Sequence, residues 1–261
     1  MNRSVSDVVA LLWVAELFSI SFQPRRYGRT EPMLNESPTR QVLRIGHRGA
    51  CGYSPENTLV SIEQAIALGC AFTEVDIRRT SDDELVLLHD ERVNRTTNGR
   101  GRVSALTLSD IRKLDAGGGQ SPPTLGDVLK TANGRIGLIL ELKTGGLAYD
   151  VCATVRASGF NRSVIYASFL QEELQHVRRA NPNAQTMILF KRPPSNPGTA
   201  AMKLQATHVG LRIDTVTTSL VTALHTRDLL VFTYTANTPA EIERMKLLGV
   251  DGIISDFPDR I

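Results

Sequence analysis

Cysteine is scarce in this sequence. Its three cysteines, Cys51, Cys70 and Cys152, are odd in number and widely spaced, and no Cys-x-x-Cys pair indicates zinc binding or dithiol chemistry. A strong charge excess is also lacking, because 30 lysines and arginines face 27 aspartates and glutamates. A nucleic-acid groove normally needs clustered basic residues. We therefore expect no nucleic-acid partner, and the cysteine content fits a reducing, cytoplasmic setting.

A long hydrophobic run is missing as well. Residues 8–20 read VVALLWVAELFSI, but Glu16 interrupts them and Arg3 is the only positive charge upstream. The run is too short to span a bilayer comfortably, so stable membrane insertion is not expected. We expect a packed N-terminal helix or a loosely attached extension over residues 1–40, with export as the alternative. The functional domain is then residues 41–261.

Short aliphatic runs alternate with longer amphipathic stretches from residue 42 onward. This alternation is typical of repeated βα units around a parallel sheet. The expected strands are residues 42–46, 72–77, 136–142, 164–168, 185–190, 207–213, 229–235 and 252–255. The expected helices are residues 56–68, 124–131, 147–157, 171–179, 217–225 and 239–248. Eight such strands close a barrel, so we predict an α/β fold, a single TIM-like (β/α)8 barrel.

One apolar run, LVLLHD at residues 85–90, does not fit the βα repeat. The eight residues from Ile77 to Glu84 are too few for a crossover between parallel strands. We expect the return arm of a small hairpin at the C-terminal mouth of the barrel, turning at residues 81–83. Barrels of this kind carry their chemistry at the carboxyl ends of the strands.

The first expected strand ends in I-G-H-R-G-A, which places the imidazole of His47 and the guanidinium of Arg48 between glycines that let a ligand approach the backbone. Alone, the His-Arg-Gly tripeptide is a weak indication of a functional site. His89 ends the hairpin and can face His47 across the mouth. Histidine suits general acid and general base roles because its pKa lies close to working pH. A metal-ligand role for the two histidines is the rival interpretation.

The second expected strand contains Glu74 and Asp76, whose side chains point to the same face because they are two residues apart. Two like charges are costly to bury together unless a cation neutralises them. Glu141 ends a third strand, and Lys143 follows on the same face. Three carboxylates favour a hard divalent ion, Mg²⁺ or Ca²⁺, over zinc. Salt-bridged acids are the alternative.

The motifs together resemble the series found in glycerophosphodiester phosphodiesterases. The matching segments are HRGACGYSPENT (47–58), EVD (74–76), HDERVNRTT (89–97), ELK (141–143), YTAN and SDFP. The resemblance covers residues 43–258 and implies a TIM-barrel enzyme that releases glycerol 3-phosphate and an alcohol from a small-molecule glycerophosphodiester. It implies the following roles: His47 and His89 as acid and base; Glu74, Asp76 and Glu141 as metal ligands; Arg48 and Lys143 as phosphate binders.

This sequence departs from the family pattern at two places. The family usually has tryptophan where this chain has Tyr234, whose ring we expect to wall the substrate pocket. The family hairpin usually turns at Asp-Gly, whereas this chain has Asp83-Glu84. Neither departure touches the expected catalytic set.

Other polar residues are expected to support the site. Glu56 and Asn57 match the family and are expected to fix the loop beside His47 by hydrogen bonds, with direct substrate contact as the alternative. Asn237 and Asp256 match the last two strand ends, in a structural or a functional role. Phe169 is expected either to line the pocket or to pack. The residues without a predicted function are His176, His208, His225 and Cys51.

Three other functions fit parts of the pattern. Related barrels act on lysophospholipids as D-type lipases, a catalytically silent barrel could bind phosphodiesters, and a barrel enzyme could use its ion for carbonyl chemistry. The sequence leaves open which histidine begins as the base. It also leaves open whether water or the neighbouring glycerol hydroxyl attacks the phosphate.

Overall fold

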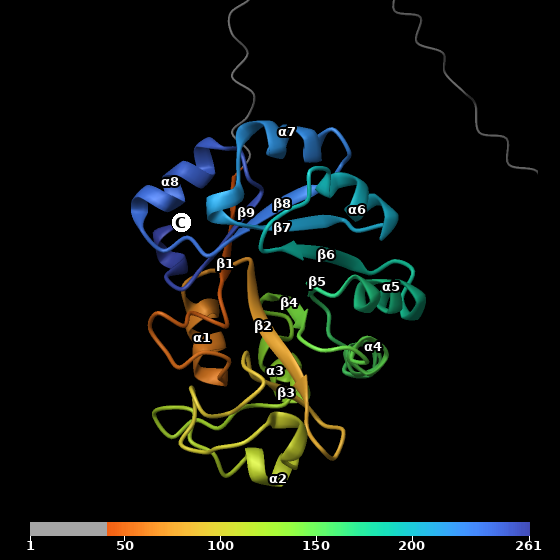
Figure 1. The fold of residues 1–261 in the computed structure, drawn as a ribbon. Helices are drawn as coiled ribbons and strands as arrows, with labels where there is room; N and C mark the ends of the chain where they lie inside the picture. The colour runs from red at the N-terminus through yellow and green to blue at the C-terminus, as the bar shows by residue number, and fades with distance from the viewer. Residues whose placement is uncertain (1–40) are drawn as a thin grey trace, which may run out of the picture. The chain divides into compact units, whose positions relative to one another are not determined.

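The computed structural model describes residues 41–261, which form a closed barrel of eight parallel strands (Figure 1). The strands are β1 Leu43–Gly46, β2 Phe72–Arg79, β4 Gly137–Leu142, β5 Val164–Ser168, β6 Gln185–Phe190, β7 His208–Arg212, β8 Leu230–Tyr234 and β9 Gly252–Ser255. Their order around the barrel is β1-β9-β8-β7-β6-β5-β4-β2, and β1 pairs with β2 through Ile45 and Phe72 to close the ring. The predicted TIM-like barrel is confirmed.

Helices surround the barrel on its outside (Figure 1). They are α1 Leu59–Ala67, α3 Leu125–Ala132, α4 Ala148–Ala157, α5 Gln171–Ala180, α6 Pro197–Lys203, α7 Thr218–His225 and α8 Pro239–Leu247. The start of the first predicted helix was wrong, because Thr58 caps α1 and leaves Glu56 in the preceding loop. Helix α6 was not predicted, although Asn196 caps it and Pro197 occupies its first position.

The predicted hairpin forms on β2. Strand β3, Leu85–Leu87, pairs antiparallel with β2, so that Arg79 lies opposite Leu85. Asp83 takes the left-handed conformation in the turn, with φ of 64°. Asp83, and not Glu84, therefore occupies the turn position at which glycine is favoured. Aspartate tolerates this left-handed conformation better than most residues. The segment after β3 carries a short helix, α2 Leu108–Ile111, and a small apolar core of its own.

The strands place alternate residues inside the barrel. The buried interior cluster is Ile45, Ile139, Ile165, Ala167, Met187, Leu189, Phe232 and Ile254. Two larger clusters lie between the strands and the surrounding helices. The apolar interior forms a floor beneath the carboxyl ends of the strands, where the predicted site residues lie.

The predicted N-terminal extension, residues 1–40, lies outside the described residues, as does its apolar run at residues 8–20. The packed helix, the loosely attached extension and the alternative of export therefore stay predictions. Within residues 41–261, no helix has the length and apolar character needed to cross a membrane.

Candidate active site

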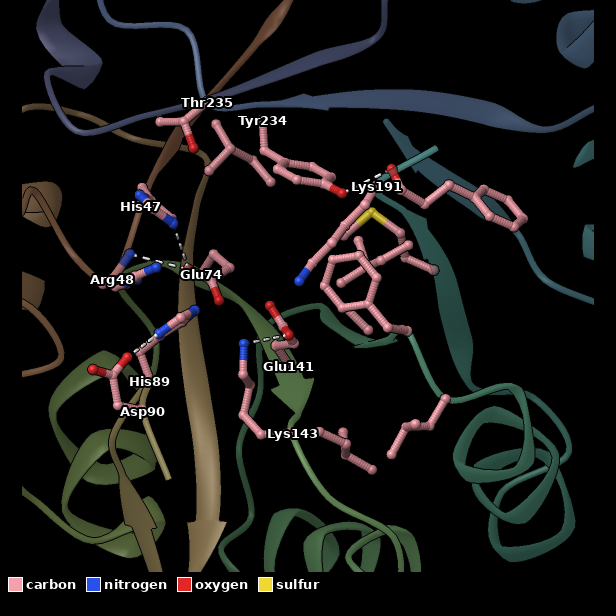
Figure 2. Close-up of a pocket in the computed structure, with 18 of the residues that line it drawn as sticks. His47, Arg48, Glu74, His89, Asp90, Glu141, Lys143, Lys191, Tyr234 and Thr235 are labelled. Carbon is pink, nitrogen blue, oxygen red and sulfur yellow. Dashed lines mark hydrogen bonds and ion pairs between the residues drawn. The ribbon is translucent and has the colours of Figure 1, made fainter. Parts of the chain in front are cut away.

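A cavity of about 810 Å³ opens at the carboxyl ends of the strands (Figure 2). One wall is charged and comes from β1, β2, β4 and the segment after β3. The opposite wall comes from β5, β6 and β8 and is mostly apolar. The cavity brings together seven of the eight predicted site residues along its lining: His47, Arg48, Glu74, His89, Glu141, Lys143 and Tyr234. The eighth, Asp76, is buried directly behind them and contacts Arg48 and Lys143.

His47 follows β1 and is held by an aspartate that directly follows the neighbouring strand β9. Its Nδ1 lies 2.6 Å from Oδ1 of Asp256. A carboxylate only accepts hydrogen bonds, so Nδ1 carries the hydrogen. Nε2 faces the acidic residues and lies 4.0 Å from Oε2 of Glu74. The second ring nitrogen is thus free for chemistry while the first fixes the ring.

Asp256 is itself held as an ionised acceptor. Asn237 Nδ2 donates to its second oxygen at 2.7 Å, and the Cys51 thiol donates to its first at 3.1 Å. Burial would raise the pKa of Asp256, but hydrogen bonds from His47, Cys51 and Asn237 hold it well below its usual range. Burial and the Asp256 contact raise the pKa of Cys51, so Cys51 stays a thiol. Asp256 therefore acts on the orientation of His47.

His89 lies two residues after β3 and is held in the same manner. Its Nδ1 lies 2.6 Å from Oδ1 of Asp90, and Arg95 Nε donates to the other oxygen of Asp90 at 2.8 Å. Arg78 donates to the backbone carbonyl of His89 at 2.7 Å. Burial lowers the pKa of His89 despite the attraction of Asp76 and Asp90, which favours a neutral imidazole. Each histidine thus has an aspartate on Nδ1.

The three predicted acidic residues converge between the histidines. Glu74 and Asp76 lie on β2 and Glu141 on β4, and each offers an oxygen within 4.8 Å of the others. Burial raises the pKa of Glu74 well above its usual value, and the charges of Asp76 and Glu141 raise it further. Burial and Asp76 likewise raise the pKa of Glu141. The cluster therefore buries more carboxylate charge than the neighbouring cations neutralise.

These residues fit a hard divalent ion. Oxygen is the ligand atom that Mg²⁺ and Ca²⁺ prefer. Oε1 of Glu74 is buried and has no hydrogen-bond partner within the described part of the chain. Such an atom is costly to bury unless something unseen satisfies it. The donor set and the unsatisfied oxygen both favour a cation among the three carboxylates.

Arg48 and Lys143 lie beside the acids. Arg48 Nη1 donates to Glu56 at 2.8 Å, and its Nε lies 3.2 Å from Oδ2 of Asp76. Lys143 Nζ donates to Glu141 at 2.7 Å and lies 3.2 Å from Oδ1 of Asp76. Burial would lower both pKa values, but the acids raise them, so both side chains stay charged.

The loop after β1 is fixed by the two residues expected to support it. Asn57 Nδ2 donates to Asp76 at 2.8 Å, and its Oδ1 accepts from the Asp76 backbone at 3.1 Å. Glu56 accepts from both Arg48 and Arg95. The expected hydrogen-bonding role of Glu56 and Asn57 is confirmed, and through Arg95 this loop is tied to the Asp90 that holds His89.

A comparison with known families identifies the chain. Residues 47–260 match the sequence profile of the glycerophosphoryl diester phosphodiesterase family. The chain belongs to this family.

Similar proteins agree along most of the chain. A glycerophosphodiester phosphodiesterase of Bacillus subtilis is 32% identical, with 96% of this chain and 95% of that protein covered. One from Caldanaerobacter subterraneus subsp. tengcongensis is also 32% identical, over 85% of this chain and 96% of the relative. The predicted family and the enzyme class, a phosphoric diester hydrolase, are confirmed.

Solved structures of the glycerophosphodiester phosphodiesterase family share the fold. One from Agrobacterium tumefaciens has a TM-score of 0.74 at 29% identity, covering 84% of this chain and 98% of that one. A phosphodiesterase of Oleispira antarctica, in complex with the product sn-glycerol-3-phosphate, has a TM-score of 0.79 at 25% identity, over 83% and 94% of the two chains.

Tyr234 is the position at which this glycerophosphodiester phosphodiesterase departs from the usual tryptophan. Its ring lines the cavity and meets Phe169 edge to face, with the ring centroids 6.2 Å apart. Its hydroxyl donates to the backbone carbonyl of Phe190 at 2.8 Å. Tyr234 thus presents a ring to the cavity, while its hydroxyl fixes the end of β6. Phe169 lines the pocket, which is one of the two roles expected for it.

Several residues of the site were not predicted from the sequence. Asp90 and Arg95 were not predicted, although both lie within a matched motif. The adjacency of His89 and Asp90 could have indicated their contact. Lys191 lines the cavity after β6 without any motif. The histidines expected to be ordinary lie elsewhere: His176, His208 and His225 are absent from the cavity lining.

Proposed function

We propose that this chain hydrolyses glycerophosphodiesters to glycerol 3-phosphate and an alcohol, with a divalent ion and with His47 and His89 as general acid and base. One observation carries the proposal. Two histidines, each with Nδ1 on an aspartate, flank a buried cluster of carboxylates in one cavity. The product bound by the Oleispira antarctica enzyme, sn-glycerol-3-phosphate, supports this substrate class.

Glu74, Asp76 and Glu141 would hold the ion, which we propose to be Mg²⁺ or Ca²⁺. When bound, such an ion supplies positive charge that stabilises the charge developing on a phosphate in the transition state. Asn57 contributes by fixing Asp76 through two hydrogen bonds. Hydrogen bonds of this kind hold ligand carboxylates in place.

Arg48 and Lys143 would bind the phosphate oxygens. Arg48 offers a planar fork and Lys143 a point charge. Both contact acids before substrate arrives: Arg48 contacts Glu56 and Asp76, and Lys143 contacts Asp76 and Glu141. Their side chains are therefore already oriented toward the reacting centre, which lowers the entropy lost on binding.

Proton transfer would use Nε2 of each histidine. Asp256 and Asp90 hold the two Nδ1 atoms, so each Nε2 points away from its aspartate and is available to the substrate. One histidine removes a proton from the attacking hydroxyl, which belongs to water or to the neighbouring glycerol carbon. The other protonates the departing alcohol oxygen. The attacking oxygen forms a new P–O bond, the P–O bond to the alcohol breaks, and its electron pair leaves with the alcohol oxygen. Attack by the glycerol hydroxyl gives a cyclic phosphate first, which water then opens to glycerol 3-phosphate.

The test is release of glycerol 3-phosphate from glycerophosphocholine and glycerophosphoethanolamine by purified protein with Mg²⁺, Ca²⁺ or chelator. His47→Ala and His89→Ala are each expected to lose a factor of about 10² or more in rate. His176→Ala is the matched control, since His176 lies outside the cavity and contacts Glu173 and Tyr149. It should keep the wild-type rate.

Other results would redirect the proposal. Release of product in chelator at the full rate would contradict the role of the ion. Cleavage of lysophospholipids but of no glycerophosphodiester would make the chain a D-type lipase with the same site. Turnover of neither substrate class would contradict the proposal altogether.

A further inference from the structure

Lys191 is a cation of the cavity that the proposed chemistry does not use. It follows β6, on the apolar wall opposite the acidic cluster. Figure 2 shows its side chain extending from that wall into the cavity. Its Nζ lies 5.5 Å from the centre of the Phe169 ring. A contact of this kind contributes only about 0.5–1 kcal/mol at an exposed site.

Three other basic side chains of the cavity are paired, and Arg192, which also lines it, lies near the charge of Asp214. Arg48 contacts Glu56 and Asp76, Lys143 contacts Asp76 and Glu141, and Arg78 donates to the His89 carbonyl. Lys191, by contrast, forms no hydrogen bond or ion pair with any residue in the range 41–261. It is an ammonium group turned toward the substrate space without a carboxylate to neutralise it.

The wall that carries Lys191 is braced at its base. Tyr234 donates its hydroxyl hydrogen to the carbonyl oxygen of Phe190, the residue directly before Lys191. The same tyrosine ring packs on Phe169, over which the lysine lies. The backbone before Lys191 is thus held by a side chain of β8, and the lysine ammonium lies over an aromatic ring. Such support places the ammonium at a defined part of the cavity.

The scissile phosphate has its proposed partners on the charged wall. Arg48 and Lys143 both contact Asp76 there, beside the three carboxylates that would hold a doubly charged ion. Lys191 follows β6 on the opposite wall, apart from that cluster. An ammonium in this place is matched by a second anionic group and not by an uncharged alcohol.

We propose that Lys191 binds an acidic group on the alcohol part of the substrate. The preferred substrates are then glycerophosphodiesters whose alcohol bears a carboxylate or a phosphate, and a purely cationic alcohol such as choline is disfavoured. This inference rests on the proposed function and names the substrate class for the same site. Lys191 is a specificity-determining residue in it and takes no part in proton transfer.

Glycerophosphoserine and glycerophosphoethanolamine provide a matched pair of probes, because their alcohols differ by one carboxylate. The quantity to measure is the ratio of kcat/KM for the serine substrate to that for the ethanolamine substrate. Lys191→Met removes the charge and keeps most of the length. The ratio is expected to fall about fivefold, the upper end for an exposed ion pair, while Lys191→Arg retains it. The wild-type ratio should fall with added salt.

Lys203→Met is the matched control, since Lys203 is exposed on α6 and does not line the cavity. It should leave the ratio unchanged. An equal loss of kcat/KM for both substrates in Lys191→Met would overturn the inference, because Lys191 would then bind the shared phosphate or glycerol. An unchanged ratio would overturn it as well. Absence of wild-type turnover on either substrate would instead defeat the proposed function on which the inference rests.

Discussion

The two ends of the barrel interior are built from opposite kinds of residue, although the same strands supply both. At the carboxyl end, His47 and Glu141 belong to a network of paired charges. At the amino end, the buried His208 packs edge to face on Phe232 with ring centroids 4.8 Å apart. The carboxyl end carries the charged candidate site, and the amino end is stabilised by packing.

The change of character takes place within two residues. Ile45 precedes His47 on the same face, Ile139 precedes Glu141, and the buried cluster that contains both isoleucines lies beneath the site. Because alternate residues point inward, the apolar layer lies directly under the charged one. A dry floor strengthens the electrostatic interactions above it. Substitutions at the two ends should therefore separate activity from stability.

The largest expected effect is loss of activity without loss of stability at the carboxyl end. Glu74→Gln should lower kcat by about 10³-fold, because it removes a proposed ligand of an ion whose effect on the transition state is several kcal/mol. The free energy of unfolding in chelator should stay the same or rise, since burial and like charges already raise the pKa of Glu74. Urea unfolding and steady-state kinetics measure the two quantities.

The same variant offers a second readout. Addition of Mg²⁺ or Ca²⁺ should raise the Tm of the wild type, because a ligand that binds the folded state stabilises it. In Glu74→Gln this shift should disappear. Glu63→Gln, at an exposed position of α1 paired with Arg135, should keep both the activity and the shift. A full Tm shift in Glu74→Gln would argue against the ion site.

The next effect concerns stability at the amino end. Burial lowers the pKa of His208 to about 4, against the weaker attraction of Asp251. Between pH 6.5 and 4 the unfolded chain binds more protons at this residue than the folded chain does, so stability falls as pH falls. The difference amounts to about 3 kcal/mol at pH 4. His208→Gln should flatten the dependence of the unfolding free energy on pH by this amount.

Denaturant unfolding between pH 7 and 4, at constant Mg²⁺, compares the two proteins. His225→Gln is the control, because His225 is only half-buried and lies at the end of α7. An identical pH dependence in wild type and His208→Gln would contradict a buried neutral histidine. The kcat at pH 7 should be the same in all three proteins, since His208 lies at the opposite end of the barrel from the cavity.

The smallest effect concerns the positioning of a histidine at the carboxyl end. Asp256→Asn should lower kcat by roughly 10- to 100-fold, by analogy with the range seen when the hydrogen-bond partner of a metal-binding side chain is removed. KM should change little, because Asp256 holds His47 and does not reach the cavity lining. Cys51→Ser, which alters another donor to Asp256, should retain most of the activity. A rise in KM at unchanged kcat would contradict the positioning role.

Most of the barrel could be predicted from the sequence because each strand is a short aliphatic run. The helix after β6 was missed because Pro197–Lys203 is short and its composition, with Gly198 and Thr199, is poor for helices. The cap at Asn196 makes up for that composition locally, but its effect depends on hydrogen bonds that a pattern does not display.

The candidate site divides in the same way. Glu74 and Asp76 could be paired from their spacing alone, because strand geometry fixes which side chains share a face. Asp256 and Asn237 lie far along the chain from His47, and only closure of the barrel brings β9 against β1. The contact of Asp256 with His47, and that of Asn237 with Asp256, therefore could not be assigned from the sequence.

The sequence by itself determined the strand-and-helix repeat, the identity of the reactive groups and the pairing of acids along one strand, because these depend on local periodicity and residue chemistry. Only the tertiary structure decided that Asp256 holds His47 and that Lys191 remains unpaired within the described part of the chain. Those features depend on distances between strands that are remote in sequence. Barrel closure fixes these distances, and no local pattern encodes them.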